Sequence, residues 1–285
     1  DSNISLFNGD PESPVSFTLL DNLLSEQHFR LSFWKVATEE INYRRFFNIN
    51  DLISLKIEDE SVFNHTHSLV FTLLKEGKIS GLRIDHIDGL YDPTTYLAKL
   101  REEVGQTFIV AEKILGLGEQ LPPVWPIQGT TGYDFLNYLN GIFCNKDSER
   151  RFTRIYSRFS NLGTSLEELL YEKKKLILEK DMAGDVDNIA NLLKKASSRD
   201  RHGGDITLYG LKMAMVEVMA RFSVYRTYIS EEVFRDEDRR HISAAVGKAL
   251  HSNPRLMHEL QFIKRFLFLE LGDYLSDEER KRCLH

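Results

Sequence analysis

Two acidic side chains stand at corresponding points of one predicted strand–helix–strand unit, within residues 79–115. Asp85 lies near the carboxyl end of the first predicted strand (79–87), and Glu112 near the carboxyl end of the second (107–114). In parallel α/β folds, chemistry takes place at the carboxyl ends of the strands. Neighbouring strands lie about 4.8 Å apart, so two inward carboxylates there can approach the ~5–5.5 Å that separates nucleophile and acid/base in retaining glycosidases.

The residues between the two acids predict the helix that connects the strands. Asp92 followed by Pro93 is a helix start, because Asp accepts from free N–H groups and proline is tolerated at the first helical position. Apolar residues recur at helical spacing up to Gly105, where a left-handed C-cap is favoured. The second strand is nearly all apolar before its acid, which is typical of a parallel strand covered on both faces. The sequence therefore predicts a right-handed βαβ unit.

Metal and nucleotide sites are only weakly indicated. His65 and His67 stand two apart on a helix predicted over 61–75, which Ser61 caps and Gly77 ends, so surface or capping roles are favoured over metal binding. Asp85 and His86 face opposite ways on a strand and cannot share a metal without a bulge. The run GLGE (116–119) lacks the third glycine and the following helix of a phosphate-binding loop. We expect no metal and no cofactor.

Composition excludes several classes of protein. The chain has 285 residues, 42% of them hydrophobic, and a net charge of −6 without a basic patch, so a nucleic-acid partner is not expected. Cys144 and Cys283 stand far apart without metal-type spacing, which favours a reducing cytoplasm over a disulfide framework. No apolar run approaches the length of a membrane span and no signal peptide opens the chain, so we expect a cytoplasmic protein without a membrane partner.

Periodicity divides the chain into three parts. Residues 1–24 are predicted as loop or linker, and residues 25–144 as a partial (β/α) catalytic barrel in which 25–37 form a strand and a turn. Residues 145–285 are predicted as an α-helical subdomain, with 3.6-residue periodicity around 165–180, 186–196, 205–221, 236–251 and 254–271. The predicted fold class is α/β, part of a (β/α)8 TIM barrel with a large inserted α-helical subdomain.

Three aromatic and arginine motifs each allow two interpretations. Tyr43 and Arg44 lie in the run YRRFF, which is either a platform for stacking a sugar or a buried aromatic cluster paired with nearby glutamates. Trp125, in a proline-rich loop, and Tyr133, in the segment after it, either stack on a sugar or anchor the loop. The run 221–229 is either a buried link or a segment that leans over the active cleft.

Five ordered segments carry a resemblance to a known family. They are INYRRFFNINDL (41–52), GLRIDHIDGLYDP (81–93), AEKILG (111–116), PIQGTTGYDFLN (126–137) and VYRTYI (224–229). Together they resemble the maltooligosyl trehalose synthases, a group within the α-amylase superfamily, glycoside hydrolase family 13. The resemblance covers nearly the whole chain from residue 27 to residue 229.

The resemblance implies roles for individual residues. Asp85 is expected to be the nucleophile, Glu112 the acid/base, and Arg83 the residue that orients the nucleophile. His86 is expected to contact the acceptor-side sugar. Further substrate-binding residues are expected at Tyr43, Arg44, Lys113, Trp125, Tyr133, Arg226 and Tyr228.

The implied reaction is an intramolecular transglucosylation, which makes the parent enzyme an isomerase. On a maltooligosaccharide or α-1,4-glucan, a retaining double displacement would convert the reducing-end α-1,4 linkage into an α,α-1,1 (trehalosyl) linkage. Two alternatives remain: an α-amylase-like glucan hydrolase, and a non-catalytic glucan-binding or helical interaction module. The superfamily's third carboxylate motif is absent from this sequence, which does not begin with Met. We therefore expect a central fragment of the enzyme with little or no activity by itself.

Overall fold

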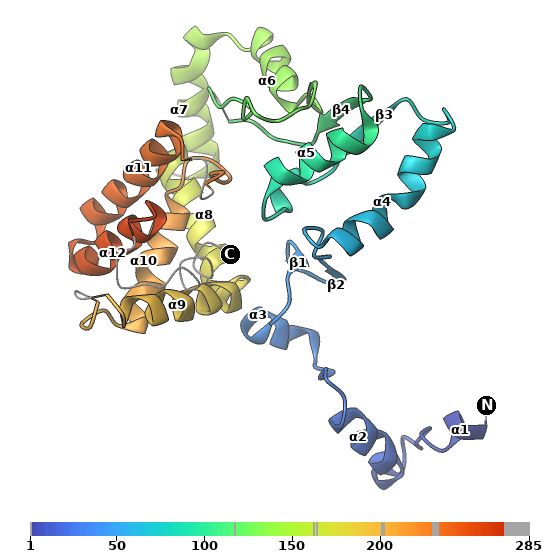
Figure 1. The fold of residues 1–285 in the computed structure, drawn as a ribbon. Helices are drawn as coiled ribbons and strands as arrows, with labels where there is room; N and C mark the ends of the chain where they lie inside the picture. Colours follow the sequence, from blue (N-terminus) through green and yellow to red (C-terminus); the bar gives the residue numbers. More distant parts are fainter. Residues whose placement is uncertain are drawn as a thin grey trace.

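The computed structural model describes residues 2–116, 118–161, 163, 165–200, 203–229 and 234–270. The chain runs from a thin N-terminal arm through a small sheet and its helices to a bundle of helices (Figure 1). Cys283 and the last residue of the helix predicted over 254–271 lie outside the described residues. No helix in the described part of the chain is long and apolar enough to cross a bilayer.

The predicted βαβ unit is confirmed. Strands β3 (Gly81–Ile84), β4 (Phe108–Ala111) and β5 (Gly129–Thr130) form a parallel sheet in that order, and helix α5 (Pro93–Val104) connects β3 to β4. The Asp92 side chain caps α5 by accepting from the N–H of Thr95 at 3.0 Å, and Gly105 follows the helix with φ 58°. Strand β3 is shorter than the predicted 79–87, because a 3₁₀ turn, η3 (Ile87–Gly89), follows closely.

Helix α4 (Glu60–Lys75) precedes β3 and packs near α5. Its cap is Asp59, whose carboxylate accepts from the N–H groups of Ser61 and Val62, so the prediction that Ser61 caps the helix is wrong. The hydroxyl of Ser61 instead donates to the same carboxylate at 2.6 Å. The predicted end is confirmed, since Gly77 takes up a left-handed φ of 66°. The part-buried His67 ring stacks on the ring of Phe63 with centroids 4.3 Å apart.

The larger core lies in a bundle of five helices at the C-terminal side. They are α8 (Leu166–Lys180), α9 (Ala183–Ser197), α10 (Leu208–Ala220), α11 (Asp236–Ser252) and α12 (Met257–Leu267). Helix α10 is the central one, because it packs against each of the other four. It is apolar nearly all round, as expected for a helix enclosed by others. Each of the five helices predicted from periodicity after residue 165 is present.

The N-terminal part differs from the prediction. Residues 1–24, expected as loop or linker, contain α1 (Ser2–Ser5), η1 (Pro14–Phe17) and most of α2 (Thr18–Ser25). The strand predicted over 25–37 is wrong: this segment contains η2 (Trp34–Val36) and the start of α3 (Ala37–Glu40). Its alternating apolar side chains face no partner strand, and Phe29, Leu31 and Phe33 are exposed. The hairpin that does form pairs β1 (Arg45–Phe46) with β2 (Ile49–Ile53).

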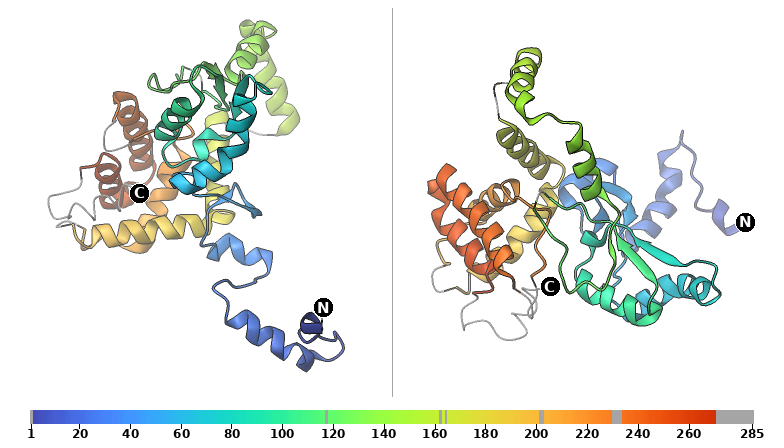
Figure 2. Two further views of the ribbon diagram at one scale, coloured as in Figure 1. Left: turned by 45° about the vertical axis from the view of Figure 1, so that its right-hand side comes forward. Right: turned by 90° about the horizontal axis from the view of Figure 1, so that it is seen from above.

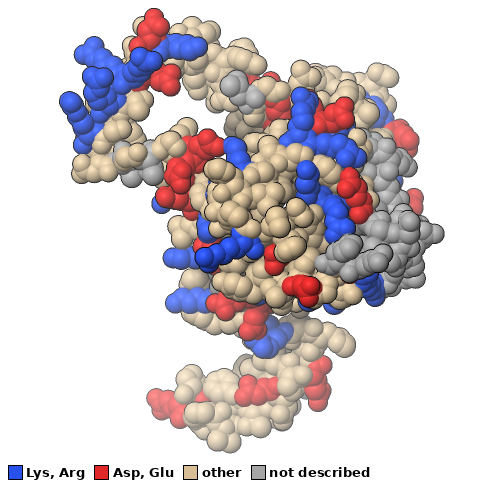
Figure 3. Space-filling view, turned by 90° about the vertical axis from the view of Figure 1, so that its left-hand side faces the viewer, with Lys and Arg blue, Asp and Glu red and all other residues tan. Residues whose placement is uncertain are grey.

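Two further helices form an arm between the sheet and the bundle. Helix α6 (Tyr133–Ile142) and helix α7 (Glu149–Ser160), with η4 (Lys146–Ser148) between them, project from the body in both views of Figure 2. Figure 3 shows this arm at the upper left, with Lys and Arg side chains gathered along it. Phe143 is 82% exposed and Phe159 is 87% exposed, so the arm presents an apolar face to solvent.

Candidate active site

A single arginine holds both predicted catalytic carboxylates. Arg83, on β3, places Nη1 2.8 Å from Oδ1 of Asp85 and Nη2 3.5 Å from Oε1 of Glu112. The parallel register, in which Ile84 opposes Ala111, explains the convergence, because each acid directly follows one of these paired residues. The N–H of Glu112 also donates to the carbonyl of Ile84 at 2.7 Å, so the strand pairing continues up to the second acid. Both carboxylates therefore contact one guanidinium at the ends of neighbouring parallel strands.

His86 links the two acids through its backbone. Its N–H donates to Oε2 of Glu112 at 3.0 Å, while its φ of 45° turns the chain sharply after Asp85. The imidazole lies against Phe47, with ring centroids 5.3 Å apart, and edge-on to Phe46 at 5.0 Å. Gly89 makes this arrangement possible, because a Cβ atom there would lie 2.6 Å from the His86 ring. Left-handed geometry at a non-glycine residue is costly and needs support from its surroundings.

The two acids differ in exposure. The Asp85 side chain is 61% exposed, whereas that of Glu112 is 24% exposed. The site is therefore open on the side of the expected nucleophile and partly enclosed on the side of the expected acid/base. No group of three or more potential metal-ligating side chains occurs among the described residues.

Asp88 was not among the residues predicted to be functional. Its carboxylate is largely buried and has two polar partners. Its carboxylate accepts a hydrogen bond from the hydroxyl of Tyr228 and lies 3.2 Å from Nζ of Lys113. The Lys113 side chain is fully buried and also pairs with Glu119 at 3.0 Å. Burial raises the pKa of Tyr228, and the hydrogen bond to Asp88 raises it further. The neutral phenol is therefore a firm hydrogen-bond donor at this position.

The side chain of Arg226 binds backbone carbonyls of the turn that contains Asp88. Its Nη1 donates to the carbonyls of Asp88 at 3.0 Å and Leu90 at 2.5 Å, and its Nη2 to that of Tyr91 at 3.2 Å. Arg44 adds a bond from Nη2 to the carbonyl of Gly89 at 2.5 Å. Burial lowers the pKa of Arg226, although the guanidinium stays charged at neutral pH. Four consecutive carbonyls, from residue 88 to residue 91, are thus tied to arginines distant in sequence.

Several residues that are expected to bind substrate make contacts with other parts of the protein. Trp125 is 5% exposed, donates from Nε1 to the hydroxyl of Thr94 at 3.1 Å, and packs edge-on to Tyr228 with centroids 5.1 Å apart. Of the two interpretations of Trp125, its burial favours the anchor. Tyr43 donates to the carbonyl of Asn50 at 2.9 Å, within the β1–β2 hairpin. Tyr133 is 39% exposed at the start of α6. Substrate contact by these residues stays a prediction.

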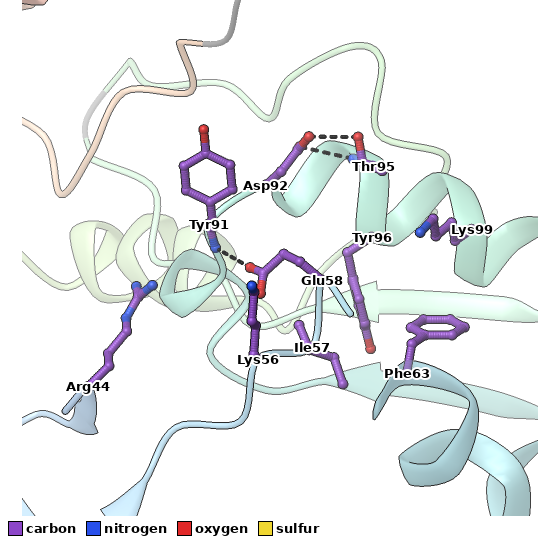
Figure 4. A pocket seen from close by; sticks show the side chains of 10 residues that line it. All are labelled: Arg44, Lys56, Ile57, Glu58, Phe63, Tyr91, Asp92, Thr95, Tyr96 and Lys99. Carbon is purple, nitrogen blue, oxygen red and sulfur yellow. Dashed lines mark hydrogen bonds between the residues drawn. The ribbon is translucent and has the colours of Figure 1, made fainter. Parts of the chain in front are cut away.

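A pocket of about 590 Å³ lies beside the N-terminal turns of α4 and α5. Figure 4 shows its lining residues, with the Glu58 carboxylate accepting from the N–H of Tyr91 and Asp92 bonded to Thr95. Neither carboxylate of the candidate site lines this pocket. It is therefore separate from the place where Arg83 joins the two acids.

The relatives found by sequence comparison carry one and the same name. No protein-family model matches the chain. Putative maltooligosyl trehalose synthases of two Mycobacterium tuberculosis strains, CDC 1551 / Oshkosh and ATCC 25618 / H37Rv, are each 43% identical over 130 residues, which is 45% of this chain and 17% of the relative. The matched segment thus spans less than a fifth of the length of these curated relatives.

Solved structures match a larger part of the chain. The structure of maltooligosyltrehalose synthase from Arthrobacter ramosus superposes with a TM-score of 0.77 at 30% identity, covering 97% of this chain and 32% of that one. A hypothetical maltooligosyl trehalose synthase from Sulfolobus tokodaii gives a TM-score of 0.66 at 34% identity, covering 90% of this chain and 32% of that one. The chain is therefore similar to maltooligosyl trehalose synthases over nearly all of its length and spans about a third of the length of their solved structures.

Proposed function

We propose that this chain supplies the nucleophile and the acid/base of a maltooligosyl trehalose synthase. The observation that carries the proposal is the contact of one guanidinium, that of Arg83, with both Asp85 and Glu112 at the ends of neighbouring parallel strands. Strands β3, β4 and β5 with α5 are then part of a (β/α)8 barrel, whose catalytic groups stand at the carboxyl ends of its strands. The enzyme class is isomerase, and the substrate is a maltooligosaccharide or α-1,4-glucan.

In the first displacement, an oxygen of Asp85 attacks C1 of the penultimate glucose. The bond from C1 to the O4 atom of the terminal glucose breaks, and Glu112 gives its proton to that oxygen. Arg83 holds the Asp85 carboxylate by an ion pair at 2.8 Å, so that an oxygen is directed at the sugar. The products of this step are a glycosyl–enzyme ester and a free terminal glucose that stays bound.

In the second displacement, the freed glucose turns and presents its own anomeric hydroxyl. Glu112, now a carboxylate, takes the proton of that hydroxyl, whose oxygen attacks C1 and breaks the bond to Asp85. Two inversions give net retention and leave an α,α-1,1 linkage. Since no water is consumed, the reaction is an isomerisation. The N–H of His86, 3.0 Å from Oε2 of Glu112, would hold that carboxylate in place through both steps.

The α-amylase-like hydrolase remains the second candidate because of one observation. The Asp85 side chain is 61% exposed in this chain, and transfer exceeds hydrolysis only where water is kept from the glycosyl–enzyme. The two reactions differ in product. Hydrolysis yields glucose and shorter maltooligosaccharides, whereas the proposed transfer yields a nonreducing trehalosyl end and no new glucose.

The test places this chain in a complete enzyme. A chimera in which it replaces the corresponding third of the A. ramosus enzyme is incubated with maltopentaose, and the products are separated by chromatography. We expect a nonreducing product, and we expect Asp85→Asn and Glu112→Gln to lower kcat by at least ~10²–10⁴-fold. Glu102→Gln, on the exposed side of α5, is the matched control. A folded chimera that releases only glucose, or that retains its rate as Asp85→Asn, contradicts the proposal.

A further inference from the structure

We propose that Asp88, Tyr228 and Arg226 form a positioning clamp by which the segment before helices α11 and α12 sets the geometry of the two carboxylates. The segment 224–229 is separated from the turn it holds by almost half of the chain: Tyr228 and Asp88 are 140 residues apart. Neither Tyr228 nor Arg226 contacts Asp85 or Glu112 directly. They act on the turn that follows Asp85, which we call the β3 turn (residues 85–91).

The first step of the argument is the fixed attachment of the clamp to the β3 turn. The Asp88 side chain is 10% exposed and lies between the phenol of Tyr228 and the ammonium of Lys113. A buried carboxylate needs such partners, because an unpaired charge in the interior costs several kcal/mol. Arg226 then fastens the carbonyls of residues 88, 90 and 91 with a single planar guanidinium. The C-terminal half of the turn therefore has little freedom.

The second step concerns the strained residue in the turn. His86 has a φ of 45°, which is unfavourable for a residue with a β-carbon unless neighbouring structure imposes it. The β3 turn reverses sharply at this residue, and its N–H then points at Oε2 of Glu112 at 3.0 Å. If the C-terminal half of the turn were released, the strained backbone could relax by rotation of the peptide plane between Asp85 and His86 together with a change in the φ of His86, and this N–H would leave the carboxylate. The clamp thus maintains the hydrogen bond from His86 to Glu112, although its own residues take no part in that bond.

The third step links the clamp to both acids at once. Lys113 directly follows Glu112, and its buried ammonium joins Asp88 to Glu119 by ion pairs of 3.2 and 3.0 Å. Asp85 lies at the start of the same turn that Asp88 anchors. Displacing Asp88 would therefore move Asp85 and Glu112 together. That the clamp serves catalysis rests on the proposed function. That it places the His86 N–H is independent of that function.

The sequence motifs are consistent with this assignment. The run 221–229 was expected either to be a buried link or to lean over the active cleft, and Arg226 and Tyr228 were expected to bind substrate. Their side chains bind the β3 turn, and Tyr228 also lies edge-on to the buried Trp125. Tyr225, three residues earlier in the same run, is 63% exposed, so the segment offers a matched phenol outside the clamp.

The experiment measures amide hydrogen exchange of the whole chain by NMR. We expect Tyr228→Phe, which removes one hydroxyl, to increase exchange of the His86 N–H by about tenfold or more, since hydrogen bonds to charged groups contribute ~1.5–3 kcal/mol. Tyr225→Phe is the control and is expected to leave it unchanged. A merely structural role would lower the melting temperature without a local change at His86 in the folded state. The amide signal needs no turnover, so its outcome is independent of the chimera assay.

Two results would overturn the clamp. One is unchanged exchange at His86 in Tyr228→Phe, and the other is an equal increase in Tyr228→Phe and Tyr225→Phe. If Tyr228→Phe does not fold, Arg226→Lys is measured in its place, because it keeps the charge and loses the forked contact to the carbonyls. There too, increased exchange at His86 supports the clamp and unchanged exchange rejects it.

Discussion

Replacing Glu217 tests whether the helical bundle depends on one buried ionic cluster. Glu217, on α10, is 1% exposed. Its carboxylate accepts from the hydroxyl of Tyr171 at 2.8 and 3.0 Å, pairs with Lys175 at 2.8 Å, and pairs with Arg221 at 3.3 Å. The cluster joins α8 to the central helix of the bundle. Glu217→Gln keeps the shape of the side chain and one acceptor oxygen, but it removes the negative charge with which Lys175 and Arg221 pair.

The magnitude follows from the burial of the partners. Breaking a fully buried ion pair costs ~3–5 kcal/mol, because the remaining charge has no partner. The Lys175 side chain is 28% exposed and that of Arg221 is 17% exposed, so both can reach some water. We therefore expect the lower end of the range, about 3 kcal/mol, which corresponds to a fall of ~6–12 °C in melting temperature for a chain of this size.

The dependence on pH gives a second signature. Burial raises the pKa of Glu217, but hydrogen bonds from Lys175 and Tyr171 and the charges of Lys175 and Arg221 outweigh it and hold the pKa below its ordinary value. This stabilisation is present above the unfolded pKa of about 4.3 and is lost as pH falls through the folded value. The hydrogen bond to Glu217 raises the pKa of Lys175, so its contribution is present below about pH 10.4 and is lost as pH rises through the folded value.

The assay is urea unfolding followed by circular dichroism at several pH values. Glu179→Gln is the matched control, because Glu179 pairs with the same lysine at 4.0 Å but is 45% exposed. Exposed helical pairs of this kind contribute ~0.5 kcal/mol or less. The reasoning is refuted if Glu217→Gln costs less than about 1 kcal/mol, or if its cost does not shrink at both acidic and alkaline pH.

Two further predictions concern the sheet side of the molecule. Burial raises the pKa of Tyr96 to about 12, so the chain should lose roughly 2–3 kcal/mol of stability as pH rises from about 10 to about 12, where only the unfolded phenol ionises. Tyr96→Phe should reduce the alkaline loss by this amount in urea unfolding at about pH 9 and about pH 12, and an unchanged alkaline loss would disprove the assignment to Tyr96. The isolated chain should show little or no turnover of maltopentaose, because the third carboxylate implied by the family resemblance is not in its sequence. Turnover close to that of the chimera would contradict this expectation.

Local signals in the sequence were sufficient for the βαβ unit. The Asp92–Pro93 start, the apolar stripe of α5 and the glycine with positive φ at Gly105 act over a few residues each, so they can be identified without knowledge of distant contacts. Parallel pairing of two short apolar strands then brought Asp85 and Glu112 to one edge. The same local reasoning failed over 25–37, since an alternating run forms a strand only where a second strand accepts its hydrogen bonds.

Local reasoning also could not find the role of Asp88. In sequence, it is one more acid after the nucleophile motif, and no pattern indicates which acid is buried. Its partner Tyr228 lies 140 residues away, and Arg226 reaches its carbonyl across 138 residues. Such pairings depend on how the helical half packs against the sheet, and spacing along the chain does not encode that packing.

The sequence by itself therefore determined the βαβ unit, the helix before it and the five helices of the bundle, and it placed the two acids at the ends of neighbouring strands, because these features follow from propensities and periodicities within some thirty residues. Only the tertiary structure decided that Arg83 contacts both acids, that His86 turns left-handed toward Glu112, and that Trp125 and Lys113 are buried. The physical reason is that burial and charge pairing are properties of the assembled molecule. The side chain of Tyr228, which was expected to contact substrate, thus binds Asp88 inside the protein.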